Sequence, residues 1–281
     1  MNVKNKSFKR FIGVLFVVLA ATSQALCALS PEIVKPEHHY EVSVRLDVPL
    51  ALGITLTSAL GVYRYYNMER VSAGKLKPRS EFLPWDRPFV GHYSGWATTV
   101  SHYTGALAVA PLALAGYSWY KGDADGHDFG AYALMFVEAF ALENALNQIV
   151  RSMQLWPRPF IYAKRGEGAK KAASARGEAY GSFYSGHASA AFTVAIFTGD
   201  WFSKVYPNSK YKPLVWASSF ALASGVAALR VVAGKHYPSD VLVGALMGTG
   251  VSLGILKLHE ICKNKVAFWV IPNNIGAVFY F

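Results

Sequence analysis

Cysteine is scarce in this sequence. Its two cysteines, Cys27 and Cys262, lack the close spacing of a zinc site and are too few to form a disulfide framework. Charged residues are also few, because they make up 16% of the 281 residues, whereas hydrophobic residues make up 53%. Several long apolar runs accompany this composition. The chain is therefore expected to be a bundle that uses lipid as part of its solvent, rather than one large soluble domain.

A concentrated basic surface is also missing. The formal net charge is +11, but the lysines and arginines are scattered over short connections between apolar runs. They do not form one stripe with interleaved aromatic residues, which is the usual pattern of a nucleic-acid-binding surface. The sequence therefore predicts no nucleic-acid partner.

The N-terminus has the pattern of a secretory signal peptide. Basic residues up to Arg10 precede an apolar stretch and then several small residues. We expect residues 1–28 to be a signal peptide, with an uncleaved first membrane helix as the alternative. Lipid attachment at Cys27 is not favoured, because Leu26 stands where a lipoprotein signal has a small residue. Residues 29–46 are expected to form a polar linker, in which the pair His38-His39 has no nearby third metal ligand.

Residues 47–260 are expected to form the main domain, an all-α membrane bundle of about six helices. Its apolar segments show little alternation of apolar and polar residues, so helices are favoured over strands. Small residues are frequent in these segments, as in closely packed membrane helices. Some segments are short for a full membrane span, so a peripheral helical bundle is the alternative. Residues 261–281 are expected to be a tail, whose final part reads as a short strand or as disordered. The apolar segments are Val48 to Tyr63, Trp96 to Trp119, Phe129 to Val150, His187 to Phe202, Pro213 to Val232 and Tyr237 to Leu258.

The most informative stretch runs from Arg230 to Asp240 and links two apolar segments. Pro238 is tolerated in a first helical turn, so a helix is expected to begin beside His236 and place it on the same face as Asp240. The carboxylate would accept a hydrogen bond from one ring nitrogen and leave the other free as a nucleophile. Arg230 places a permanent positive charge at the end of an apolar segment. Such a charge indicates that an anion binds there.

Two further stretches carry polar residues beside apolar segments. Arg151 and Arg158 lie seven residues apart, about two helical turns, and so on the same side if the helix continues. Ser185, Gly186 and His187 open the next helix. The Ser185 and Gly186 amides at this helix N-terminus are suited to holding phosphate oxygens, and His187 would protonate a leaving oxygen. The connection from 164 to 180 between these stretches reads as a mobile surface loop.

The order of the helices predicts that these stretches meet. Arg151, Arg158 and His187 flank one connection, and the chain then crosses away and returns before Arg230. All three stretches are therefore expected at the same end of the bundle.

These residues resemble the three signature motifs of the type 2 phosphatidic acid phosphatase superfamily. The motifs read Arg-x6-Arg-Pro at 151–159, Tyr-Ser-Gly-His at 184–187 and Arg-x5-His-x3-Asp at 230–240. Their combination in this order is far more specific than any one of them alone. The sequence departs from the usual motifs at three positions, where Arg151 replaces lysine, Tyr184 replaces proline and Leu229 replaces serine.

The resemblance implies a role for each motif residue. His236 would attack phosphorus and form a phosphohistidine, Asp240 would orient it, and His187 would act as general acid. The phosphoryl oxygens would be held by Arg151, Arg158 and Arg230 together with the amides at Ser185 and Gly186. No metal or other cofactor is expected, because three arginines supply the positive charge that phosphoryl transfer needs.

The implied function is removal of phosphate from a lipid phosphate or diphosphate, with membrane lipids as the surroundings. Substrates of the phosphatidate, phosphatidylglycerol phosphate, undecaprenyl diphosphate or lipid A class fit this reading. A vanadium-dependent haloperoxidase and an acid phosphatase with soluble substrates are alternatives within the superfamily, and a non-enzymatic membrane protein is the alternative outside it. The implied location is a bacterial cell membrane with a periplasmic active site. Two other arguments favour the cytoplasmic face instead. A cleaved signal followed by six membrane crossings would place the motifs there, and the positive-inside rule agrees.

Overall fold

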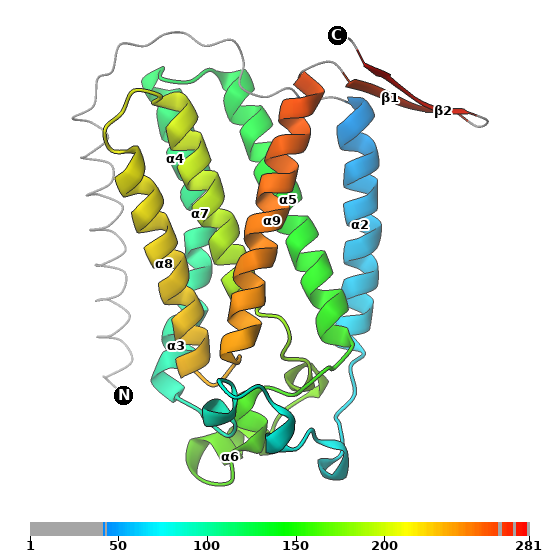
Figure 1. The fold of residues 1–281 in the computed structure, drawn as a ribbon, viewed down its shortest axis with the longest axis vertical. Helices are drawn as coiled ribbons and strands as arrows, with labels where there is room; N and C mark the ends of the chain where they lie inside the picture. The colour runs from blue at the N-terminus through cyan, green and yellow to red at the C-terminus, as the bar shows by residue number, and fades with distance from the viewer. Residues whose placement is uncertain (1–41, 43, 264–265, 272–273, 280–281) are drawn as a thin grey trace.

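A computed structural model describes residues 42, 44–263, 266–271 and 274–279 of the chain. The predicted signal peptide and most of the predicted linker lie outside the described residues. The described part is a bundle of long helices with short helices and loops gathered at one end (Figure 1).

Helices occupy each of the six predicted apolar segments. The α-helices are α2 (Val44–Tyr66), α3 (Gly95–Tyr103), α4 (Ala110–Lys121), α5 (Gly126–Ser152), α6 (Gly166–Ala173), α7 (Gly186–Val205), α8 (Lys212–Val232) and α9 (Pro238–Lys263). The 3-10 helices are η1 (Ala73–Lys75), η2 (Arg79–Glu81), η3 (Arg87–Phe89), η4 (Thr104–Val109), η5 (Pro159–Tyr162) and η6 (Gly177–Tyr180).

Two predicted segments differ from the structure. The segment from Trp96 to Trp119, expected as one helix, is divided into α3, η4 and α4. Pro111 in the first turn of α4 cannot donate a backbone N–H, which favours a new start there. The connection from 164 to 180, expected as a loop, contains α6 and η6.

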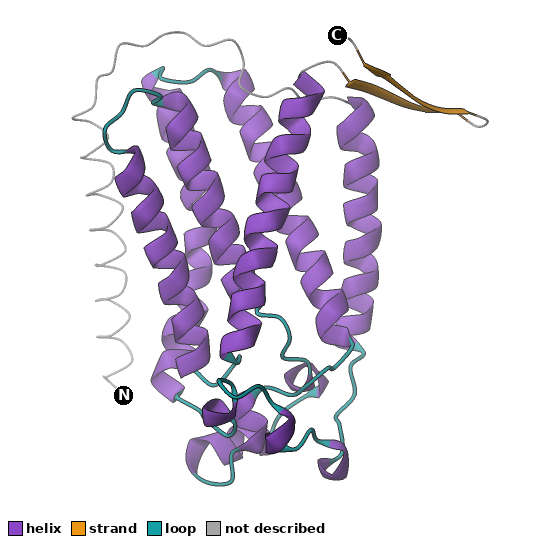
Figure 2. Ribbon diagram, viewed as in Figure 1, coloured by secondary structure: helices purple, strands orange, loops and turns teal. Residues whose placement is uncertain are grey.

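The C-terminal tail forms two strands after the last helix. The strands, β1 (Val266–Ile271) and β2 (Asn274–Phe279), pair antiparallel, with Val266 opposite Phe279 (Figure 2). Both strands are rich in Val, Ile and aromatic residues, which favour extended structure. Of the two sequence readings of this tail, the strand is the one that the structure has.

Helix α7 lies inside the bundle, where it packs against α4, α5, α8 and α9, while α2 packs along α5. A β-carbon added to Gly244 of α9 would lie 2.5 Å from the Ser185 carbonyl oxygen, and one added to Gly248 would lie 2.1 Å from the Ser189 carbonyl oxygen. Glycine at these two positions, one turn apart, therefore lets α9 approach the start of α7. This close approach brings the first turn of α9 beside the second predicted motif.

Several helices have the character of membrane spans. Within the described residues, three helices are long and apolar enough to cross a bilayer: Gly126–Ser152, Lys212–Val232 and Pro238–Glu260. Large apolar side chains also point outward, including Leu52, Leu56 and Leu60 along one face of α2. Such a surface suits lipid better than water, which indicates a membrane protein.

Candidate active site

The three predicted motifs meet at one end of the bundle. Helices α5 and α8 end there, and α7 and α9 begin there, above the short helix α6 (Figure 1). A backbone hydrogen bond joins the second and third motifs, because the Ser185 amide donates to the Asp240 carbonyl. The Arg158 amide of the first motif donates to the Ala179 carbonyl, five residues before the second motif. The expected convergence is therefore present in the structure.

His236 and Asp240 form a buried pair. Their exposed fractions are 2% and 0%, and His236 Nδ1 lies 3.5 Å from Asp240 Oδ2. This separation is too long for a good hydrogen bond, and His236 Nδ1 has no hydrogen-bond partner among the described residues. The carboxylate thus lies beside Nδ1 of the ring, as expected, and does not occupy Nε2.

Asp240 is fixed by three donors that the sequence did not reveal. Its Oδ2 accepts hydrogen bonds from Ser182 Oγ at 2.6 Å and from the Tyr237 amide at 2.9 Å. Its Oδ1 accepts one from Trp156 Nε1 at 3.1 Å. Trp156 lies within the first motif and Ser182 two residues before the second, but both are far from Asp240 along the chain, so the sequence gave no signal of these contacts. The three bonds hold the carboxylate in one orientation beside His236.

A second carboxylate, Asp86, secures the start of α9. Asp86 is buried, and it accepts hydrogen bonds from the Ser239 amide at 3.0 Å and from Ser239 Oγ at 2.6 Å. It comes from the basic connection after α2, where nothing in the sequence pointed to the site. Because these bonds satisfy donors in the first turn of α9, they act as a helix cap supplied from a distant segment.

Asp86→Ala is expected to lower the free energy of unfolding by about 1–2 kcal/mol and to lower kcat by about tenfold or more, because the first turn of α9 carries Asp240. Thermal unfolding in detergent and phosphate-release kinetics measure the two effects. The matched control is Asp125→Ala, which removes the cap of α5, where Asp125 Oδ1 accepts from the Asp128 amide at 2.7 Å. That control should lose stability and keep its kcat. A wild-type kcat in folded Asp86→Ala would mean that the cap does not position the site.

Arg151 is held by backbone and by an aromatic ring. It is buried, and its guanidinium donates to the Gly181 carbonyl at 3.0 Å and to the Glu178 carbonyl at 3.1 Å. The same group lies 4.6 Å from the centre of the Tyr65 ring. A lysine could not make this fork of two bonds, so the structure supplies a reason for arginine at this position. Tyr65, in the last turn of α2, thus packs on a site residue.

Arg158 and Arg230 keep donors available. Arg230 Nη1 donates to Ser101 Oγ at 2.8 Å, while the buried Nε atoms of Arg158 and Arg230 have no hydrogen-bond partner among the described residues. Burial and the neighbouring charge of Arg151 lower the pKa of Arg158 to about 9. Burying such donors without a partner costs free energy, which the binding of an anion to them would offset.

The two predicted amides differ in availability. The Ser185 amide donates to the Asp240 carbonyl at 3.0 Å, so it is not free to bind phosphate as the sequence suggested. The Ser185 hydroxyl instead accepts from the Ala188 amide and caps α7. Gly186 begins α7 and packs on Asn147, whose Nδ2 donates to the Tyr184 carbonyl at 2.7 Å. Of the two amides, that of Gly186 is the remaining candidate for a phosphate oxygen.

His187 and His236 share a cationic environment. His187 follows Gly186 in the first turn of α7, and the charges of Arg230 and Arg158 act on both histidines. Burial, followed by the charge of Arg158, lowers the pKa of His236 well below its ordinary value. His236 is therefore neutral at neutral pH, and a neutral ring nitrogen has the lone pair that a nucleophile needs.

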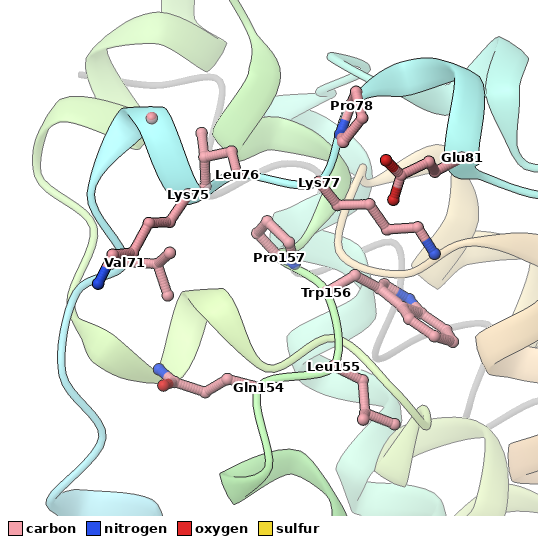
Figure 3. A pocket seen from close by; sticks show the side chains of 11 residues that line it. Val71, Lys75, Leu76, Lys77, Pro78, Glu81, Gln154, Leu155, Trp156 and Pro157 are labelled. Carbon is pink, nitrogen blue, oxygen red and sulfur yellow. The ribbon is translucent and has the colours of Figure 1, made fainter.

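A cavity of about 440 Å³ borders the site. It lies between the connection after α2 and the segment after α5, and the ring of Trp156 forms part of its wall (Figure 3). The Lys77 side chain extends toward this ring, with Nζ 5.0 Å from its centre. Because Trp156 also donates to Asp240, one wall of the cavity is in direct contact with the site.

Comparison with known proteins agrees with the motifs. Residues 132–263 match the family model described as the PAP2 superfamily. No curated protein matches the chain. The solved structures that it resembles include a transmembrane PAP2 type phosphatidylglycerolphosphate phosphatase from Bacillus subtilis, at 17% identity and a TM-score of 0.43, covering 78% of this chain and 98% of that one. They also include LpxE from Aquifex aeolicus, at 21% identity and a TM-score of 0.40, covering 63% of this chain and 97% of that one.

Both structural similarities are remote, so the assignment depends on the matched residues and on the motifs within them. The matched range contains all three motifs, from Arg151 to Asp240, and it includes α5, α7, α8 and α9 almost entirely. Residues 132–263 of this chain are therefore similar to the PAP2 superfamily.

Proposed function

We propose that this protein is a phosphohydrolase that removes phosphate from a lipid phosphate or diphosphate through a phosphohistidine. The observation that carries the proposal is the buried His236–Asp240 pair within electrostatic reach of three guanidinium groups. A phosphoryl group in transfer needs an in-line nucleophile and positive charge around its oxygens. The match of residues 132–263 to the PAP2 superfamily supports a phosphatase, and the apolar helices support a substrate that lies in a membrane.

The proposed reaction has two steps. In the first, His236 Nε2 attacks phosphorus while the bond from phosphorus to the leaving oxygen breaks, and His187 gives that oxygen a proton. Burial and the charge of Arg230 lower the pKa of His187 to about 3 without substrate, so this role requires that the negative charge of the bound phosphate raise that pKa. In the second, water attacks the phosphorus of the phosphohistidine while the bond from phosphorus to His236 Nε2 breaks, His187 takes a proton from the water, and inorganic phosphate leaves. Arg158 and Arg230 hold the phosphoryl oxygens in both steps, and Asp240 keeps the His236 ring in place and stabilises its positive charge.

Phosphate release from a panel of lipid phosphates and diphosphates tests this proposal. The detergent-purified full chain is assayed in EDTA, with and without vanadate, beside a soluble phosphomonoester and a peroxide-and-halide assay. We expect EDTA-resistant, vanadate-sensitive release from at least one lipid. Hydrolysis of the soluble ester alone would favour an acid phosphatase, and halide oxidation alone would favour a haloperoxidase. Folded protein that is silent in every assay would contradict an enzymatic role.

Lys235 is expected to make substrate binding depend on pH. It is buried next to His236, and its Nζ lies 4.8 Å from the centre of the Phe160 ring. Burial and the charge of Arg158 lower the pKa of Lys235 to about 7. The free protein therefore loses this positive charge as pH rises through about 7, and KM for an anionic substrate should rise over the same range.

Lys235→Met should remove this rise in KM between pH 6 and pH 8, whereas Lys235→Arg should keep KM low throughout. Lys210→Met, in the exposed connection before α8, is the control and should keep the wild-type profile. An unchanged profile in Lys235→Met would mean that another group causes the dependence.

We also propose that the site faces the periplasm, on the family resemblance alone. A reporter fused in the connection between α7 and α8, at the opposite end of the bundle (Figure 1), tests the orientation. An alkaline phosphatase reporter that is active there would place the site in the cytoplasm and overturn this part of the proposal.

A further inference from the structure

A second buried group of titratable side chains lies far from the motifs. Asp47 of α2, Glu138 of α5 and His259 of α9 are exposed by 7%, 4% and 0%. His259 is close to the end of α9 and Asp240 close to its start, so about 28 Å of helix separates them. The proposed phosphatase site makes no use of this group.

The three side chains converge on one point. His259 Nε2 lies 3.0 Å from Glu138 Oε2 and 3.4 Å from Asp47 Oδ1. One ring N–H can point to only one of these two oxygens. In addition, Glu138 Oε1 has no hydrogen-bond partner among the described residues. A buried carboxylate that is only partly satisfied costs free energy, so the arrangement favours a ligand that interacts with all three side chains.

We propose that Asp47, Glu138 and His259 bind one divalent transition-metal ion, such as Zn²⁺. The three ligand atoms lie within 4.8 Å of one another. Bonds of about 2.0–2.2 Å in a tetrahedral zinc site place ligand atoms about 3.4 Å apart, close to the two measured separations. The imidazole favours a transition metal over Mg²⁺ or Ca²⁺, which prefer all-oxygen sites. Three protein ligands leave a fourth position open.

The ion would join three helices at the end of the bundle opposite the motifs. Asp47 lies in the first turn of α2, which packs chiefly along α5. A metal bond to α5 and α9 at this point would fix the start of α2 against the bundle. The site is therefore structural, and its effect should appear in stability before it appears in catalysis.

Metal analysis of the full chain tests the proposal. Protein purified in detergent without chelator is analysed by inductively coupled plasma mass spectrometry, and its thermal unfolding is followed after EDTA treatment, with and without added Zn²⁺. We expect about one equivalent of metal per chain and a Tm that rises by several degrees when Zn²⁺ is restored.

Glu138→Gln keeps the shape of the side chain and should lose both the metal and the Zn²⁺ response, as should His259→Ala. Glu260→Gln is the matched control, because Glu260 is exposed on the same helix and pairs with Lys257 at 2.9 Å. This control should keep both the bound metal and the Zn²⁺ response. Folded wild-type protein without bound metal and without a Zn²⁺ response would overturn the proposal, and so would an equal response in Glu138→Gln.

The result is independent of the proposed phosphatase activity. His236→Ala should still bind the metal, because the motifs lie at the other end of the bundle. Conversely, loss of the metal in Glu138→Gln should leave His236 and its surrounding arginines unchanged, so phosphate release below the lowered Tm should persist. Failure of one proposal therefore leaves the other standing.

Discussion

Replacing His236 by alanine is expected to abolish phosphate release, with a fall in kcat of at least about a thousandfold. The side chain would supply the atom that bonds to phosphorus, and no other described histidine pairs with a buried carboxylate at this end of the bundle. The variant should still fold, because Asp240 keeps its bonds to Ser182, Trp156 and the Tyr237 amide. Steady-state phosphate release and thermal unfolding measure the two expectations.

A covalent intermediate gives this prediction a second readout. Brief reaction with a labelled lipid phosphate, followed by denaturation in alkali, should leave acid-labile phosphate on the wild-type chain and none on His236→Ala. His127→Ala is the control, because His127 is exposed at the far end of α5; it should keep both rate and label. Substantial turnover or labelling in His236→Ala would rule out this nucleophile.

The second large effect is expected at Arg158. Arg158→Ala should lower kcat/KM by about a hundred- to a thousandfold, the usual cost of losing one preorganised donor to a developing charge. Burial and the charge of Arg151 already disfavour the charged form of Arg158, and a phosphoryl group would relieve that repulsion. Arg158→Lys should recover part of the loss, because lysine restores the charge but not the planar fork.

Vanadate binding separates this role from a packing role. Vanadate should raise the Tm of the wild type by several degrees, and this shift should shrink in Arg158→Ala. Arg165→Ala is the matched control, because Arg165 is exposed in the same connection. An Arg158→Ala protein with the wild-type vanadate shift and wild-type kcat/KM would show that Arg158 does not contact the phosphoryl group.

The positions of the motif residues could be predicted because two simple rules decide them. Hydrophobic runs of sufficient length become helices, and successive helices that cross the bundle alternate in direction. Arg151 at the end of α5, Gly186 at the start of α7 and Arg230 at the end of α8 must therefore lie at the same end. The i, i+4 spacing likewise predicted that Asp240 would lie beside His236, and the structure has the pair 3.5 Å apart, although His236 lies two residues before the start of α9.

Hydrogen bonding within the site could not be predicted in the same way. The helix-start rule suggested that the Ser185 amide would be free, but the close approach of α9 gives it the Asp240 carbonyl as a partner. Similarly, Asp86 lies 153 residues from Ser239, and no local pattern connects them. Such contacts depend on how distant segments fold over the end of the bundle.

Local residue patterns were enough to predict most of the helical segments, the three motifs and the end of the bundle where they meet, because these patterns set helix formation and chain direction. The hydrogen-bond partners within the site depend on the tertiary structure. Arg151 donates to the Gly181 carbonyl, the Ser185 amide donates to the Asp240 carbonyl in α9, and the Asp240 carboxylate accepts from Ser182 and Trp156. The tertiary structure also decided that Asp47, Glu138 and His259 come together from three helices. These choices depend on atom-scale distances between helices, which residue order along the chain does not specify.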